Sequence, residues 1–165
     1  PPNQPKIFDE NNKERRNLVG PYTEGSSLSL NCHVVGGQPL PRVIWYRNGK
    51  LIDSSDYFDE DQTMKNELTI SILTRSDLHA DLSCETFNNN VSTPLVTTVH
   101  VDMNFGPLEV TIFDKNHQIT AGRIYDLFCQ AVGSRPQAVL TWYLDGRRIE
   151  GGKEIVSSSE FITPL

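Results

Sequence analysis

Residues 32–49 read CHVVGGQPLPRVIWYRNG, with a cysteine at Cys32, a tryptophan thirteen residues later and an Asn-Gly pair at the end. A second copy, CQAVGSRPQAVLTWYLDG, occupies residues 129–146, an offset of 97 residues. Residues identical at this offset include Gly25/Gly122, Leu30/Leu127, Cys32/Cys129, Val35/Val132, Gly36/Gly133, Pro39/Pro136, Trp45/Trp142, Tyr46/Tyr143, Gly49/Gly146 and Ile52/Ile149. The chain therefore contains an internal repeat of about a hundred residues.

The repeat has the pattern of a β-sandwich. A cysteine, a tryptophan on the next strand and tight hairpins at this period are typical of tandem immunoglobulin-like domains. The fold class we expect is all-β, with tandem immunoglobulin-like β-sandwiches of which the second is truncated. Such a unit is about 100 residues long. We therefore expect a complete domain at residues 1–104 and the N-terminal part of a second domain at residues 105–165.

The three cysteines fit this division. Cys84 follows Cys32 by 52 residues, and both lie on inward faces of expected strands. We expect them to form the disulfide between the two sheets over Trp45; the alternative, a reactive thiol pair, is disfavoured by those inward faces. Trp142 is the matching core residue of the second copy. A partner for Cys129 at the same spacing would fall beyond the last residue, so we expect Cys129 to be unpaired.

Alternation of apolar and polar residues places the strands. The expected strands include residues 28–34, 42–47, 67–73 and 99–103. In the third of these, Leu68, Ile70 and Ile72 are expected to point inward. Asn48-Gly49 suits the positive φ angles of a two-residue hairpin turn. Residues 10–17 (ENNKERRN) are expected to be a solvated loop with a local basic spot.

Charge and hydropathy limit the partners and the compartment. The net charge is −6, which argues against nucleic acid and anionic membranes as partners because both need a basic footprint. No apolar run approaches the ~18 residues of a membrane span. Cysteines at this spacing and a glycosylation sequon indicate an oxidising, extracellular compartment. We expect the chain to come from a longer precursor, at the cell surface and held there by a single membrane anchor.

Nothing in the sequence indicates catalysis, a cofactor or a small-molecule substrate. The four histidines are scattered, and no nucleophile motif or phosphate-binding glycine loop occurs. Residues 53–61 (DSSDYFDED) are acidic, but they lack the ligand spacing of an EF-hand. A solvated edge loop is the favoured interpretation, and calcium binding is the alternative. We therefore expect a binding protein rather than an enzyme.

Two surface features are candidates for function. Ile44 and Tyr46, with Tyr143 in the second copy, are expected to face outward and to form protein contacts, since tyrosine is favoured at interfaces. Cover by neighbouring side chains is the alternative for these residues. Asn90-Val91-Ser92 is the one Asn-x-Ser/Thr sequon, and Asn90 is a candidate for glycosylation.

Several segments together resemble the second and third immunoglobulin-like domains of the insect Sidestep family. They are residues 20–25 (GPYTEG), 28–32 (LSLNC), 36–39 (GGQP), 43–45 (VIW), 121–125 (AGRIY), 133–136 (GSRP) and 138–142 (AVLTW). The resemblance implies a membrane-anchored axon-guidance ligand that binds Beaten path immunoglobulin receptors. In that family the receptor contact lies in the first domain. This region would then be a spacer behind the partner-binding domain, and no binding residue transfers to it.

Two alternatives remain open from the sequence. The chain could be an immunoglobulin stretch from the ectodomain of a receptor tyrosine kinase or phosphatase, with the enzyme elsewhere in the precursor. It could also belong to a secreted adhesion or decoy protein that has no membrane anchor.

Overall fold

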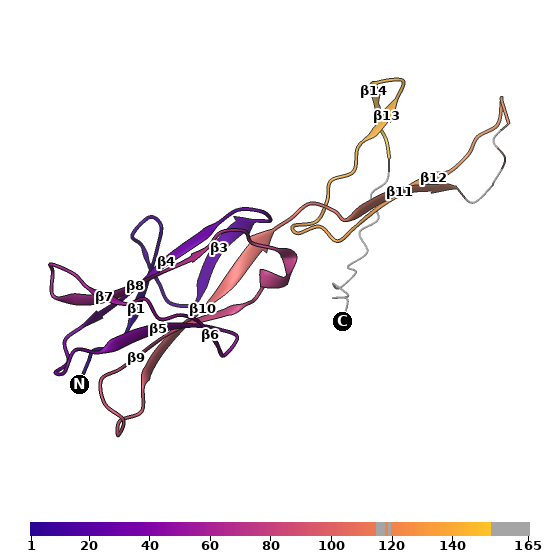
Figure 1. Cartoon of the computed structure of the whole chain (residues 1–165). Coiled ribbons are helices and arrows are strands. Elements are labelled where there is room, and N and C mark those ends of the chain that lie inside the picture. Colours follow the sequence, from indigo (N-terminus) through magenta and orange to yellow (C-terminus); the bar gives the residue numbers. More distant parts are fainter. Residues whose placement is uncertain (115–117, 119, 153–165) are drawn as a thin grey trace. The chain divides into compact units, whose positions relative to one another are not determined.

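The computed structural model describes residues 1–114, 118 and 120–152, and these residues form an all-β structure (Figure 1). The chain divides into two compact units, Pro1–Asn104 and Phe105–Leu165. The expected all-β class is confirmed; within the described residues the helical content is one short 3₁₀ turn, η1, at Arg75–Asp77.

The first sheet of the first unit has the strand order β2-β1-β4-β8-β7. Its strands are β1 (Lys6–Asp9), β2 (Glu14–Arg15), β4 (Leu28–Val35), β7 (Tyr57–Phe58) and β8 (Thr63–Ile70). Every pairing in it is antiparallel, and the register of β4 on β8 places Cys32 opposite Asn66.

The second sheet has the order β3-β10-β9-β5-β6. Its strands are β3 (Leu18–Thr23), β5 (Arg42–Arg47), β6 (Lys50–Asp53), β9 (Asp81–Phe87) and β10 (Leu95–Asn104). β3 pairs parallel with β10, whereas the other pairings are antiparallel. β1 therefore belongs to one sheet and β3 to the other, so the start of the chain contributes an edge region to each.

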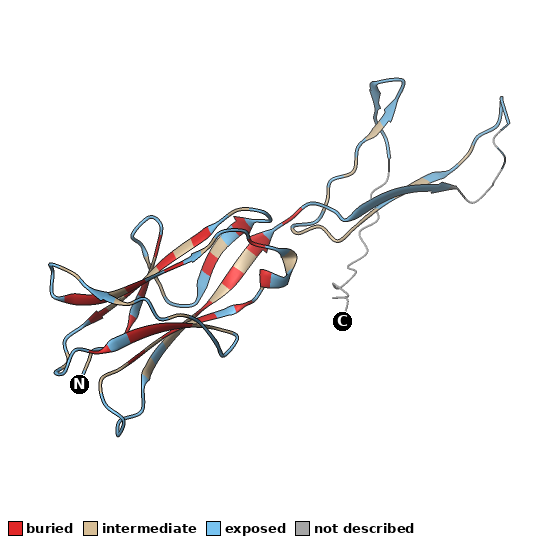
Figure 2. Ribbon diagram, viewed as in Figure 1, coloured by how far each residue is buried: buried red, intermediate tan, exposed pale blue. Residues whose placement is uncertain are grey.

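The core of the first unit lies between the two sheets, where the inward residues of their strands meet (Figure 2). The largest fully buried side chains are Trp45, Ile7, Leu28, Leu30, Leu73, Leu82, Met103, Val19, Val34, Val43, Val99 and Val101. Cys32 of β4 and Cys84 of β9 form a disulfide across this core. Trp45 stands opposite Cys84 on β5, so the tryptophan lies beside the disulfide as expected.

A buried asparagine adds a polar link between the sheets. Asn66 of β8 has no solvent exposure, and its Nδ2 donates to the carbonyl oxygen of Val43 at 2.9 Å. In return, Trp45 Nε1 donates to the carbonyl oxygen of Asn66 at 3.0 Å. Buried donors need such partners because an unsatisfied one costs the full desolvation penalty. The sequence does not indicate this role of Asn66, because an asparagine in an alternating strand gives no signal of burial.

The turn after β5 forms as the sequence predicts. Asn48 and Gly49 have φ angles of 47° and 76°, and Arg47 pairs with Lys50 on either side of them. The turn is also tied to the start of β9, because Asp81 N donates to Asn48 Oδ1 at 2.9 Å. Asp145 and Gly146 repeat the same turn in the second unit, with φ angles of 49° and 76°.

Two expectations about the first unit are wrong. Residues 10–17 are not simply a solvated loop, because the Asp9 carboxylate accepts hydrogen bonds from the backbone of Asn11 and Lys13 and from Arg15 Nε. These bonds fold the segment into a hairpin containing β2. Ile72 is 67% exposed rather than inward. The reason is that β8 ends at Ile70, and the alternation does not continue through the bends that follow.

The described part of the second unit contains two two-stranded sheets. β11 (Glu109–Asp114) pairs with β12 (Leu127–Val132), and β13 (Trp142–Leu144) pairs with β14 (Arg147–Ile149). Cys129 is an unpaired, half-buried thiol on β12, and Trp142 is half-buried on β13. The further strand considered for residues 154–165 lies outside the described residues.

Candidate protein-contact surface

The outer side of three neighbouring strands in the second sheet forms a continuous surface. Its residues, which we call the β5–β9–β10 face, are Arg42, Ile44, Tyr46, Asp81, Ser83, Glu85, Phe87, Val96, Thr98 and His100. They point outward because they alternate with the core residues of the same strands. The register aligns them in rows across the sheet, one row being Tyr46, Ser83 and Thr98.

The face combines apolar patches with a polar centre. Ser83 Oγ and Thr98 Oγ1 share a hydrogen bond of 2.8 Å in the middle. Val96 is 44% exposed. On the neighbouring edge strand β6, Leu51 stands beside Tyr46 and is 53% exposed. The aromatic residue beside apolar ones fits the enrichment of tyrosine at protein interfaces.

One end of the face is polar and charged. His100 Nδ1 lies 2.7 Å from Asp81 Oδ1, and both side chains are about half exposed. Arg47 is paired on β5 with Leu82, the residue after Asp81, and forms an ion pair with the buried carboxylate of Asp77 in η1. That ion pair anchors the segment leading into β9, so the strand that carries much of the face is held firmly at its start.

The three predicted contact residues differ in how far they are exposed to solvent. Ile44 is only 8% exposed, so the expectation that it offers contact area is wrong. Glu85 stands directly opposite it on β9, and Arg42 and Tyr46 flank it along β5. Tyr46 is half-buried at the surface. Tyr143 is exposed in the second unit, where it pairs with Arg148 on β14.

The acidic segment 53–61 uses its carboxylates within the protein. Asp56 accepts from Arg42 Nε at 2.9 Å and from Val43 N at 2.9 Å, and Asp53 accepts from Ser55 N at 2.8 Å. Asp59 pairs with Lys65, and this hydrogen bond lowers the pKa of its carboxyl below the usual value. Among the described residues no group of three or more His, Cys, Asp or Glu side chains is arranged to hold a metal ion.

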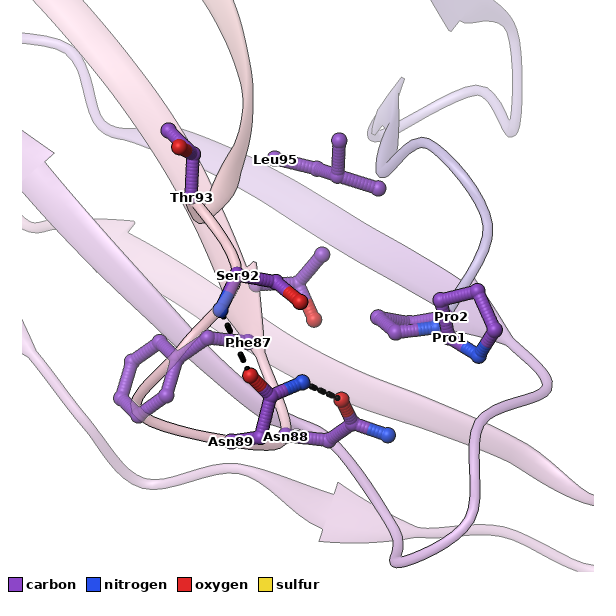
Figure 3. Close-up of a pocket in the computed structure, with 9 residues that line it drawn as sticks. Pro1, Pro2, Phe87, Asn88, Asn89, Ser92, Thr93 and Leu95 are labelled. Carbon is purple, nitrogen blue, oxygen red and sulfur yellow. Dashed lines mark hydrogen bonds between the residues drawn. The ribbon is translucent and has the colours of Figure 1, made fainter.

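A small hollow lies at the base of the loop between β9 and β10 (Figure 3). Its volume is about 130 Å³, below the roughly 300–1,000 Å³ of ligand pockets. The residues around it are Pro1, Pro2, Thr86, Phe87, Asn88, Asn89, Ser92, Thr93 and Leu95. The hollow is too small for a substrate-sized molecule, so the protein surface is the better candidate site.

Searching the part of the chain that the structure describes gives no helix with the length and apolar character of a membrane span.

Comparison with known proteins relates the chain to one family. Residues 5–88 match the family described as an immunoglobulin domain. Mouse nephrin is 27% identical over 130 residues, covering 79% of this chain and 10% of nephrin. Rat cell adhesion molecule 2 is 24% identical over 151 residues, covering 88% of this chain and 34% of that protein. The chain thus spans about a tenth to a third of these relatives.

Solved structures share the fold. The three-domain ectodomain of mouse nectin-like molecule 4 superposes with a TM-score of 0.58 at 18% identity, covering 86% of this chain and 46% of that one. A fragment of titin, domains I67–I69, gives a TM-score of 0.50 at 17% identity, covering 90% of this chain and 49% of that one. Both are tandem immunoglobulin arrays, in agreement with the expected fold class.

Proposed function

The chain belongs to the immunoglobulin-domain family, and from that premise we propose that it recognises another cell-surface protein through the β5–β9–β10 face. The chain is related to adhesion proteins of the immunoglobulin superfamily. The observation that carries the proposal is the surface row of half-buried residues around Tyr46, where the exposed Leu51 and the Ser83–Thr98 pair offer apolar area and hydroxyl groups side by side.

The disulfide supports the extracellular location that this proposal requires. The fold alone does not distinguish compartments, because the matched relatives include a muscle M-line assembly protein of Caenorhabditis elegans. Cys32 and Cys84 form a disulfide in the core, and disulfides persist in oxidising environments such as the cell exterior. The disulfide therefore supports an extracellular location, and we propose that the chain is part of the ectodomain of a membrane-anchored recognition protein.

The second unit fits the same proposal as the start of a second domain. On β11 and β12 the register brings Val110, Ile112, Leu127, Cys129 and Ala131 onto one face. In the first unit the equivalent face of β4 is covered by the sheet that carries Trp45 and Cys84.

The resemblance to the Sidestep family gives a finer version of the proposal. In it the protein is a guidance ligand for a Beaten path-like receptor, and this stretch is a spacer behind the domain that makes the contact. The two versions differ in whether this chain binds by itself.

A binding assay separates them. The secreted chain would be tested as a multimer against a panel of immunoglobulin-family surface proteins, next to a longer form that includes the preceding domain. Binding by the chain itself, lost on Tyr46→Ala or Leu51→Ala, supports the β5–β9–β10 face. Tyr57→Ala is the matched control, because Tyr57 is an exposed tyrosine on β7 of the other sheet. Binding by the longer form alone supports the spacer version and refutes the contact at Tyr46.

A further inference from the structure

The loop between β9 and β10 begins with three consecutive asparagines, and the third differs from the other two in its hydrogen bonding. Asn88 Nδ2 donates to the carbonyl oxygen of Pro39 at 3.0 Å. Asn89 Nδ2 donates to Asn88 Oδ1 at 2.9 Å. Asn90 is exposed, and within the described part of the chain its side chain has no hydrogen bond. Two of the three amides therefore build the loop, and the third is left available.

The side chain of Asn89 sets the shape of the loop tip. Its Oδ1 accepts a hydrogen bond from Val91 N at 2.9 Å. It also accepts one from Ser92 N at 2.7 Å, which Figure 3 shows. This turn around the asparagine carries Asn90 and Val91 to the outside, where Val91 is 96% exposed. The full acceptor sequence, Asn90-Val91-Ser92, is therefore on the surface, outside any strand.

An aromatic ring lies three residues before the free amide. Phe87 is the last residue of β9 and is half-buried at the end of the β5–β9–β10 face. Figure 3 shows its ring on the side of the loop away from Pro1 and Pro2. Arg42, opposite Phe87 on β5, directs its guanidinium to Asp56 and to the carbonyl oxygen of Ser54. The charged group is thus committed elsewhere, and the ring is left as apolar surface near the tip.

We propose that Asn90 carries an N-linked glycan whose first N-acetylglucosamine packs on the ring of Phe87. The donor is an oligosaccharide linked through a diphosphate to a lipid. Asn90 Nδ2 bonds to C1 of the sugar while the bond from C1 to the diphosphate oxygen breaks. The amide nitrogen gives up one proton to a base, and the lipid diphosphate leaves. Folding then brings the C–H face of the sugar against the aromatic face, which removes apolar area of both from water.

The first test measures whether the sugar is present. The chain is secreted from a eukaryotic host with a supplied signal peptide, so that a missing glycan reflects the loop and not the compartment. Its mass is compared before and after an N-glycan-removing amidase. We expect a mass loss for the wild type and for Ser92→Thr, which keeps the acceptor pattern, and none for Asn90→Gln or Ser92→Ala. A wild-type chain without the mass loss overturns the proposal.

The second test measures the packing on Phe87. Enzymatic removal of the glycan should lower the thermal midpoint of the wild type by a few degrees, the size that one aromatic contact gives in a domain of about a hundred residues. The drop should be smaller in Phe87→Leu and in Phe87→Ala, and unchanged in Val96→Ala, an exposed apolar residue of the same face. The leucine variant retains apolar bulk and keeps the test valid should the alanine variant not fold. Equal drops in all variants overturn the contact with Phe87.

Discussion

Reducing the Cys32–Cys84 disulfide should remove a large part of the stability of the first unit. The bond closes a loop with a sequence separation of 52 residues. In the chain-entropy treatment a loop of that length restricts the unfolded chain by about 4 kcal/mol at 25 °C. Single domains have total stabilities of only about 5–15 kcal/mol. With a urea dependence of roughly 2 kcal/mol per molar, the loss corresponds to a fall of about 2 M in the unfolding midpoint.

The assay follows Trp45, which stands opposite Cys84 in the core. A Trp142→Phe, Cys129→Ser background leaves Trp45 as the fluorescent reporter and removes the thiol that could exchange with the disulfide. Urea unfolding of the oxidised and reduced proteins is then compared. Reduction keeps both sulfur atoms in place, so a further loss in Cys32→Ala/Cys84→Ala measures packing and not loop closure. Equal midpoints for the oxidised and reduced forms would refute the loop-closure reasoning.

Three other perturbations test separate features by urea unfolding. Asn66→Ala should cost about 1–3 kcal/mol, because it strips a buried backbone carbonyl of its partner; a neutral result would show that the link between the sheets is dispensable. Gly20→Ala should destabilise more than Gly25→Ala: both have positive φ, but at Gly20 a Cβ would lie 2.5 Å from a backbone oxygen, whereas at Gly25 the space is open. Burial raises the pKa of Asp9, but hydrogen bonds from Lys13, Arg15 and Asn11 outweigh it and lower the pKa below 3.8. The stability that Asp9 contributes is therefore present above the usual carboxyl pKa and decreases as the pH falls below it. The difference in unfolding free energy between Asp9→Asn and the wild type should thus be smaller at pH 2.5 than at pH 6; a pH-independent difference would contradict this.

The sequence predicted the elements that are determined by residues close together in the chain or by a recurring residue pattern. Alternation with a period of two predicted β4 and the second half of β10, because their inward residues are all apolar. Asn48-Gly49 predicted its hairpin, because few other residue pairs tolerate two positive φ angles. The Cys-Trp-Cys pattern predicted the disulfide, since residues that repeat together in this fold meet across its core.

Features that depend on neighbours from distant parts of the chain were missed or mistaken. Alternation indicates that Ile44 faces outward, but not that the surrounding residues leave it only 8% exposed. The hairpin of β1 and β2 arises from hydrogen bonds to the Asp9 carboxylate, which leave no apolar period to detect. The sequon predicted an acceptor at Asn90. The hydrogen bonds of Asn89 and the position of the Phe87 ring could be seen only in the structure.

The parallel pairing of β3 with β10 has a mechanical consequence. The chain enters β3 at Leu18 and leaves β10 at Asn104, and the register pairs Leu18 with His100 and Thr23 with Asn104. Once β1 has been pulled away from β4 in the other sheet, tension between the two ends of the first unit would pull β3 and β10 lengthwise past each other. Their hydrogen bonds would stretch together instead of opening one at a time, as they do in a hairpin pulled apart from its open end. A cell-surface protein that is stretched between two cells would resist extension at the paired strands β3 and β10.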